Sequence, residues 1–233
     1  MSPAPAPRPR PTRWRPIVTG ALALLVALVV FVVPFALIAL QAVKTRRDAG
    51  RLDFAWPSEW QPLRNLWDVV RERDYMLLLA YWNSTIITLG AVTLLVIFAS
   101  MVGYVVQRRR SRLGVVVMAL ALAGLMIPPA VVPTIWVLQG LGLFKTVHGM
   151  ILIQVAYVLS FSVLLYRAFI ATIPRELEAA IIDGAKPWQI FFRVVLPLLW
   201  PVTVTNIVVQ SIAVFNDFTN PLDYLPGRES VTV

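Results

Sequence analysis

Long apolar runs alternate with short polar segments along this chain. Each run has enough residues, at about 1.5 Å of rise per residue, to cross a hydrocarbon core of about 30 Å as a helix. The fourth run carries Arg167 near its end, and the interiors are otherwise free of charge. This pattern predicts an all-α polytopic membrane protein with five transmembrane helices, at about 17–40, 81–106, 113–138, 148–170 and 194–215.

The segments outside these runs differ in character. Residues 1–16 are rich in proline and arginine, which predicts a disordered tail. A signal peptide is the alternative reading of the run at 17–40, but the run is long for one and no small-residue cleavage site follows it. We therefore expect a retained first helix. The polar stretch 41–80 predicts an extramembrane loop with short interfacial helices, and 81–233 holds the remaining spans.

Charge is scarce and unevenly placed. Charged residues make up 14% of the chain, with a net charge of +9, and the basic ones flank apolar runs. Such clusters orient a membrane protein more often than they bind nucleic acid. The arginines before the first run and those at 107–112 place these segments, together with 171–193, on the cytoplasmic side and 41–80 outside. The basic residues that follow the first run argue against this orientation: Lys44, Arg46, Arg47 and Arg51.

Little catalytic chemistry is available to this chain. It has no cysteine and a single histidine, His148, so thiolate and multi-histidine metal sites are excluded. A membrane-embedded enzyme would need paired carboxylates, a metal cluster or a nucleophile with a base, and no predicted span holds one. An ion-coupled secondary transporter or channel usually relies on ionisable groups within the membrane, which these spans also lack.

The connector at 171–193 is unusual for a membrane protein. Pro174 suits the first turn of a short helix, and Pro187 can begin a second one. Between them lie small residues and Gly184, which permits a tight turn or a close approach by another backbone. Two such helices would form a knob that fits a groove in another protein. A helix lying flat on lipid is the alternative, but it leaves the Glu178-Ala179-Ala180 cluster unexplained.

This connector carries a specific motif. The motif resembles the EAA loop of ABC-importer permeases: it reads Glu178-Ala179-Ala180, three residues, Gly184, nine residues and then Val194-x-Leu196-Pro197. Every position matches except Val194, where the family pattern has isoleucine. Asp183-Gly184-Ala185 is similar to the carbohydrate branch of that family.

Other segments extend the resemblance over about 81–233. Two segments are similar to maltose-type permeases. The first is Leu125-Met126-Ile127-Pro128-Pro129 followed by Leu141-Gly142-Leu143, and the second is Phe215-Asn216-Asp217-Phe218 followed by Asn220-Pro221-Leu222. Members of the family typically have a sixth helix. The charged, turn-rich residues after 215 cannot form one, so we expect the natural protein to continue past Val233 into another apolar run.

The resemblance implies a function. The chain would have the type I importer permease fold in a bacterial inner membrane, and would form the translocation path for a sugar with a second permease subunit. Two ATPase subunits would hydrolyse ATP with Mg²⁺, an extracytoplasmic solute-binding protein would deliver substrate, and this chain would carry no cofactor and no enzyme activity. A polyol or glycerol phosphate is the alternative substrate. The residues implied in coupling to the ATPase are Glu178, Ala179, Ala180, Asp183, Gly184 and Ala185.

Polar residues of the fifth run are the candidates for the substrate path. Thr203, Asn206, Gln210 and Asp217 recur at helical spacing and so predict one face, and Asn216 adjoins them. Polar groups inside a membrane usually face protein or water. The alternative role is to form hydrogen bonds between packed helices. Gln154, Ser160 and Ser162 of the fourth run have the same two candidate roles, contact with the substrate path or bonds between helices.

Overall fold

The computed structural model describes residues 14–109, 111–174, 186–225, 227 and 232, and every regular element within them is helical. The chain divides into two compact units, Met1–Arg71 and Glu72–Val233. Helix α3 (Pro62–Arg108) crosses the division. Its backbone leaves the helical conformation at Glu72 and takes positive φ at Arg73, Asp74 and Tyr75.

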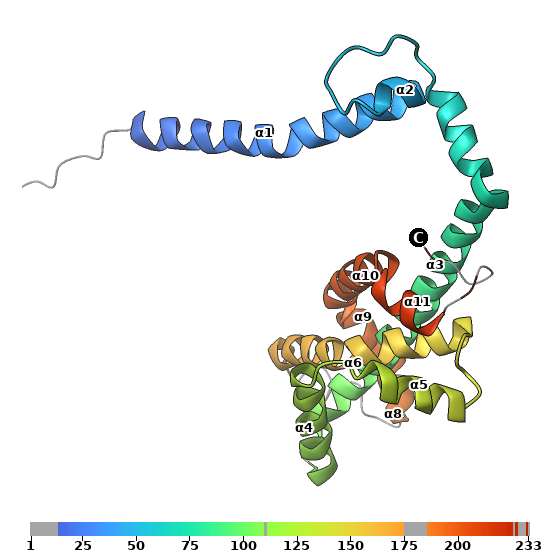
Figure 1. The fold of residues 1–233 in the computed structure, drawn as a ribbon. Helices are drawn as coiled ribbons and strands as arrows, with labels where there is room; N and C mark the ends of the chain where they lie inside the picture. Colours follow the sequence, from blue (N-terminus) through green and yellow to red (C-terminus); the bar gives the residue numbers. More distant parts are fainter. Residues whose placement is uncertain (1–13, 110, 175–185, 226, 228–231, 233) are drawn as a thin grey trace, which may run out of the picture. The chain divides into compact units, whose positions relative to one another are not determined.

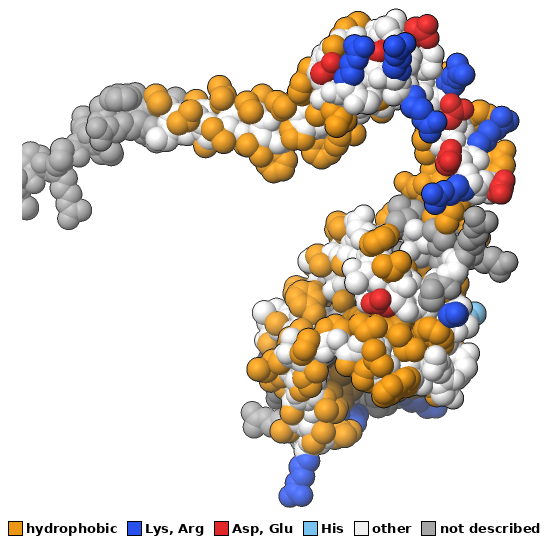
Figure 2. Space-filling view, viewed as in Figure 1, with side chains coloured by type: hydrophobic (Ala, Val, Ile, Leu, Met, Phe, Trp, Pro, Cys, Tyr) orange, Lys and Arg blue, Asp and Glu red, His pale blue; other side chains and the backbone are white. Residues whose placement is uncertain are grey.

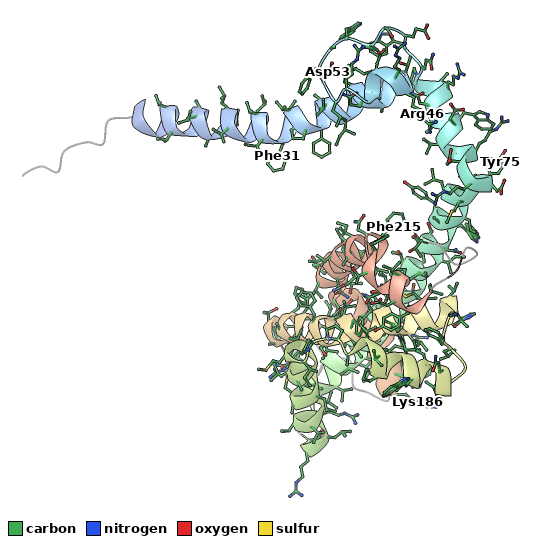
Figure 3. The ribbon with its side chains drawn as sticks, in the orientation of Figure 1. Phe31, Arg46, Asp53, Tyr75, Lys186 and Phe215 are labelled. Carbon is green, nitrogen blue, oxygen red and sulfur yellow. The ribbon has the colours of Figure 1, made fainter. Side chains whose placement is uncertain are left out.

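The first unit begins with one long apolar helix. Helix α1 (Trp14–Val43) has no charged residue between Val18 and Val43, and none of its central window is buried by the rest of the chain. Figure 2 shows hydrophobic side chains along the described part of the helix, and Phe31 projects from it in Figure 3. Thr45 caps the short helix α2 (Arg46–Ala49) by accepting a hydrogen bond from Asp48 N. A loop then leads to Pro62, at the start of α3.

The second unit is organised around α6 (Val147–Thr172). Helices α4 (Arg112–Met126), α10 (Trp200–Phe215) and α11 (Thr219–Tyr224) all pack on it (Figure 1). Helix α5 (Val131–Gly140) follows α4. Before α10 the chain forms α8 (Pro187–Ile190), a π-helical turn, η1 (Phe191–Val195), and α9 (Leu196–Leu198).

Two buried clusters hold these helices together. One joins α3, α6 and α11 through residues such as Leu95, Met150 and Tyr224. The other joins α3 and α6 to the η1–α9 segment through residues such as Tyr166 and Leu199. Many outward-facing side chains of this unit are also hydrophobic (Figure 2). An apolar exterior over a packed interior suits a bundle that faces lipid.

The described residues contain fewer continuous spans than the five predicted. Three helices are long and apolar enough to cross a membrane: Val18–Val43, Pro62–Arg108 and Val147–Thr172. A fourth span exists if Trp188–Leu198 and Trp200–Phe215, which meet at a bend of 75°, count as one. The single helix predicted at 194–215 is therefore bent at Leu199, between Pro197 and Pro201, neither of which has a backbone N–H to donate.

The helix predicted at 113–138 is also interrupted. The structure has two shorter apolar helices, α4 and α5, separated at Ile127–Ala130. Pro128 and Pro129 explain the break, because proline removes a helical donor and disfavours the α conformation in the residue before it. A hydropathy window averages over these two residues and misses them.

The segment 41–80 contains α2 and the part of α3 that precedes the break at Glu72–Tyr75, so it holds short helices, as predicted. Helical backbone resumes after Tyr75, a few residues before the start predicted at 81. Proline suits the first turn of a helix, and the leucines and arginines that follow are good helix formers.

Candidate functional site

A seam of buried polar side chains lies between α6 and α10. Ser162 and Tyr166 are one turn apart on α6, and Thr203 and Asn206 lie one turn apart on α10. All four are almost completely buried. Gln210, on the same face of α10, is buried as well. The helical spacing of 203, 206 and 210 therefore places these three residues together, as the sequence predicts.

Direct hydrogen bonds cross the seam. Ser162 Oγ donates to Asn206 Oδ1 at 3.1 Å, and the hydroxyl of Tyr166 donates to Thr203 Oγ1 at 3.1 Å. Asn206 Nδ2 finds no partner atom among the described residues. In this conformation the polar face of α10 is therefore occupied by α6. Contact of these residues with a substrate remains a prediction.

A second polar group lies where α10 ends. The helix stops at Phe215, so Asp217 does not share the face of Thr203 as its spacing suggested. Instead Asp217 Oδ1 accepts from the backbone N of Thr219 and of Asn220 at the start of α11, and its other oxygen accepts from Gln154 Nε2 of α6. Asp217 thus ties α11 to α6. Asn216 is exposed, and its side chain donates to Ile212 O at 2.9 Å.

Two tyrosines bring α11 and α6 together nearby. The hydroxyls of Tyr157 and Tyr224 are hydrogen-bonded to each other. Burial, and then this pairing, raises the pKa of Tyr224, so its hydroxyl stays protonated at any physiological pH. Tyr157 also lines an open cleft of about 660 Å³ at the α4–α5 break, together with Leu125, Pro128 and Pro129.

The EAA residues Glu178, Ala179, Ala180, Asp183, Gly184 and Ala185 lie outside the described residues. Their flanks are described. On the N-terminal side Arg108 Nη2, at the end of α3, donates to the carbonyl of Ile173 at 2.8 Å. On the C-terminal side Lys186 N donates to Gln189 Oε1 at 3.0 Å, in the first turn of α8.

The contact of Arg108 with Ile173 fixes where the connector leaves α6. A cation at the C-terminus of a helix also interacts favourably with the helix dipole. Nearby, Arg167 Nε of α6 donates to Gln107 Oε1 of α3 at 3.1 Å. The ends of α3 and α6 therefore lie together, as they must if 107–112 and 171–193 share one side of the membrane. The sequence indicated only an orienting charge for Arg108, because its carbonyl partner is 65 residues away.

The described residues contain no group of three or more His, Asp or Glu side chains that could hold a metal ion. The described residues thus combine helix-to-helix hydrogen bonds, an apolar exterior, three helices long enough to span a membrane and a bent helix pair that can form a fourth span. Together these features define a multi-span helical membrane protein.

Comparisons with known proteins narrow this class. The chain belongs to the family of binding-protein-dependent transport system inner membrane components, whose family model matches residues 95–222. This match places the chain in the inner membrane as a multi-pass protein.

Two curated relatives illustrate the family. The melibiose/raffinose/stachyose import permease protein MelC of Bacillus subtilis is 36% identical over 158 residues, which cover 66% of this chain and 57% of that protein. The diacetylchitobiose uptake system permease protein NgcG of Streptomyces coelicolor is 30% identical over 199 residues, covering 83% of this chain and 64% of that protein. The chain thus spans less than two thirds of the length of either relative.

A solved structure shares the fold. The crystal structure of a bacterial ABC transporter involved in the import of the acidic polysaccharide alginate aligns with a TM-score of 0.83. The alignment covers 99% of this chain and 80% of that chain at 21% sequence identity. At this identity the likeness establishes the fold alone.

Proposed function

We propose that this chain is a permease subunit of an ATP-driven importer of sugars, and that oligosaccharides are its substrate class. The single observation that carries the proposal is the family match over 95–222, which includes the complete EAA spacing from Glu178 to Pro197. Relatives named for melibiose, raffinose, stachyose and diacetylchitobiose support an oligosaccharide. A polyol or a glycerol phosphate is the alternative substrate.

The proposed mechanism assigns no bond chemistry to this chain. It and a second permease subunit line the path, an extracytoplasmic binding protein delivers the sugar, and two ATPase subunits bind ATP and Mg²⁺. The connector at 171–193 docks on an ATPase subunit through Glu178, Ala179, Ala180, Asp183, Gly184 and Ala185. The proposed polar residues of the path are Thr203, Asn206 and Gln210, which face it when α6 and α10 separate, together with Asn216 and Asp217 just beyond the end of α10.

Transport by the assembled complex tests the substrate class. The tagged chain would be purified from its host with its bound subunits and reconstituted in liposomes with the binding protein. We expect ATP-dependent uptake of a labelled oligosaccharide such as raffinose or diacetylchitobiose. Uptake of labelled glycerol 3-phosphate, with no oligosaccharide transported, would replace the proposed substrate by the alternative.

A substitution in the connector tests coupling. A branched side chain at Gly184 would obstruct the proposed turn or docking surface, so Gly184→Val should lose most ATP-dependent uptake while the chain still inserts into the membrane. Gly140→Val is the matched control, because a Cβ at Gly140 meets open space. Copurification of the ATPase with Gly184→Val, together with uptake at the wild-type rate, would contradict the docking role.

A further inference from the structure

The loop from Lys44 to Gln61, here named the aromatic loop, begins where α1 ends. The apolar helix Val18–Val43 has 26 residues and is therefore about 39 Å long. A hydrocarbon core is about 30 Å thick, and headgroups bring the bilayer to about 40–45 Å. When α1 spans the membrane, Val43 therefore lies at the level of the lipid headgroups.

Hydrogen bonds to backbone carbonyls at the end of α1 return the far end of the aromatic loop to the same level. Gln61 N donates to Val43 O at 3.0 Å. Asn65 Nδ2 donates to Ala42 O at 2.9 Å and to Lys44 O at 2.8 Å. The loop therefore leaves the end of α1 and comes back to it, so neither of its ends can move far from the headgroup region.

A buried lysine fixes the middle of the loop. The side chain of Lys44 is 1% exposed, and its Nζ lies 2.9 Å from Asp53 Oδ1 and 2.8 Å from Asp53 O. Gln41 Nε2 of α1 also donates to Asp53 O, at 2.8 Å. Figure 3 labels Asp53 on this loop. Because burying an ammonium is costly unless it is paired, these bonds favour one conformation of the loop.

That conformation turns large apolar side chains outward. Trp56 is 75% exposed, and Phe54 and Trp60 are each more than half exposed. The rings of Trp56 and Trp60 pack edge to face with their centroids 5.3 Å apart. Arg46 and Arg47 on α2 are exposed, and Arg51 lines a small hollow together with Trp56. Figure 2 shows basic side chains, with acidic ones among them, over this part of the unit. Tryptophan next to cationic side chains is typical of a membrane–water interface.

We propose that the aromatic loop is a lipid anchor: Phe54, Trp56 and Trp60 insert into the headgroup region of the leaflet in which α1 ends, and Lys44 holds them in position. Lipid is the favoured occupant because the apolar helix Val18–Val43 is long enough to cross a bilayer and the loop begins directly after it. This inference is independent of the transported substrate.

Spin labels in lipid nanodiscs test the anchor, since the chain has no native cysteine. Trp56→Cys and Trp60→Cys would be labelled one at a time in the full chain, so that each variant keeps the other tryptophan. Arg47→Cys on α2 is the control position. Oxygen enters lipid, and a water-soluble nickel chelate does not. We expect the ratio of oxygen to nickel accessibility to be several-fold higher at 56 and 60 than at 47.

Two results would overturn the proposal. Equal ratios at 56, 60 and 47 would place the aromatic residues in water. Low accessibility to both reagents at 56 and 60 would mean that protein, and not lipid, covers them. Adding Lys44→Met tests the positioning role. We expect the ratio at 56 to fall toward that at 47, and an unchanged ratio would remove Lys44 from the anchor.

Discussion

Buried hydroxyl and amide groups between α6 and α10 find most of their partners on the facing helix. Tyr166 and Ser162 donate to Thr203 and Asn206, and all four side chains are excluded from solvent. In a membrane such bonds are worth about 0.5–1.5 kcal/mol each, because a polar group without a partner pays for its desolvation. The seam therefore selects one register of α10 on α6 and adds modestly to stability.

Removal of one hydroxyl from the seam tests its energetic role. Tyr166→Phe keeps the buried ring and deletes the bond to Thr203, so we expect a loss of about 1 kcal/mol in the free energy of unfolding. Unfolding of the detergent-solubilised chain by SDS would measure it. Tyr81→Phe is the matched control, since the ring of Tyr81 is half exposed and packs on Phe215. Equal midpoints for Tyr166→Phe and wild type would show that the bond contributes nothing.

The Lys44–Asp53 pair predicts a response of the aromatic loop to acid. The hydrogen bond from Lys44 lowers the pKa of Asp53 below its ordinary value of 3.8. Because folding lowers the pKa of this carboxyl, its ionised form stabilises the folded state at any pH above the pKa that it has in the unfolded chain. That stabilisation is lost as the pH falls through the lower pKa that it has in the folded state. The loop should therefore be fully held at neutral pH and released only below about pH 4.

Limited proteolysis within 44–61 at graded pH would measure this release with an acid-stable protease. Asp53→Asn should be cleaved faster at neutral pH and show a weaker acid response. The response that remains in Asp53→Asn would come from Asp48, whose pKa is lowered chiefly by its hydrogen bond from Ser58. Identical profiles for wild type and Asp53→Asn would remove Asp53 from the control of this loop.

At the scale of elements, close packing of α3 on α6 depends on a missing side chain. A Cβ on Gly103 would lie 2.9 Å from Tyr166 Cβ and 3.2 Å from both Arg167 N and Val163 O. Backbone atoms cannot move aside as a flexible side chain can, so any larger residue must separate the two helices. Small residues are typical of such contacts in membrane proteins.

Gly103→Ala should therefore destabilise the second unit by about 1–3 kcal/mol through overpacking. Thermal unfolding in detergent, followed by the helical circular dichroism signal, would measure the change. Gly140→Ala, where the added methyl group meets open space, should leave the transition close to that of wild type. A transition for Gly103→Ala that also stays at the wild-type temperature would indicate that the helices are not in close contact.

Hydropathy along the sequence predicts the type of each element well and the continuity of the helices poorly. Uncharged apolar runs predicted α1 and α6 closely, because hydropathy determines what lipid accepts. The same criterion joined α4 to α5 across Pro128 and Pro129 and missed the bend at Leu199. Spacing placed Thr203, Asn206 and Gln210 on one face, and Ser162 was a candidate for a bond between helices. The sequence could not pair Ser162 with Asn206 or indicate Tyr166 at all, since contacts between distant segments leave no periodic signal.

At the scale of the whole molecule, the proposed orientation can be tested directly. Residues 107–112 are predicted to be cytoplasmic and 41–80 to be outside, because the former are basic without acidic neighbours. Single cysteines at Ser111 and Ser58 would be exposed to a membrane-impermeant maleimide in intact cells. We expect labelling at 58, and at 111 only after lysis. The reverse pattern would invert the topology.

The bend at Leu199 has a mechanical consequence. Leu199 N donates to Val195 O at 3.0 Å, Thr203 N donates to Leu199 O at 2.8 Å, and the Leu199 side chain is fully buried, so the arms on either side of the bend are joined firmly. If a straight helix turned about its own axis, its far end would stay in place. Helix α10 has 16 residues and meets the preceding helical segment, Trp188–Leu198, at a bend of 75°. A turn of about 10° around the axis of Trp188–Leu198 would therefore carry the far end of α10, about 24 Å away, sideways by about 4 Å.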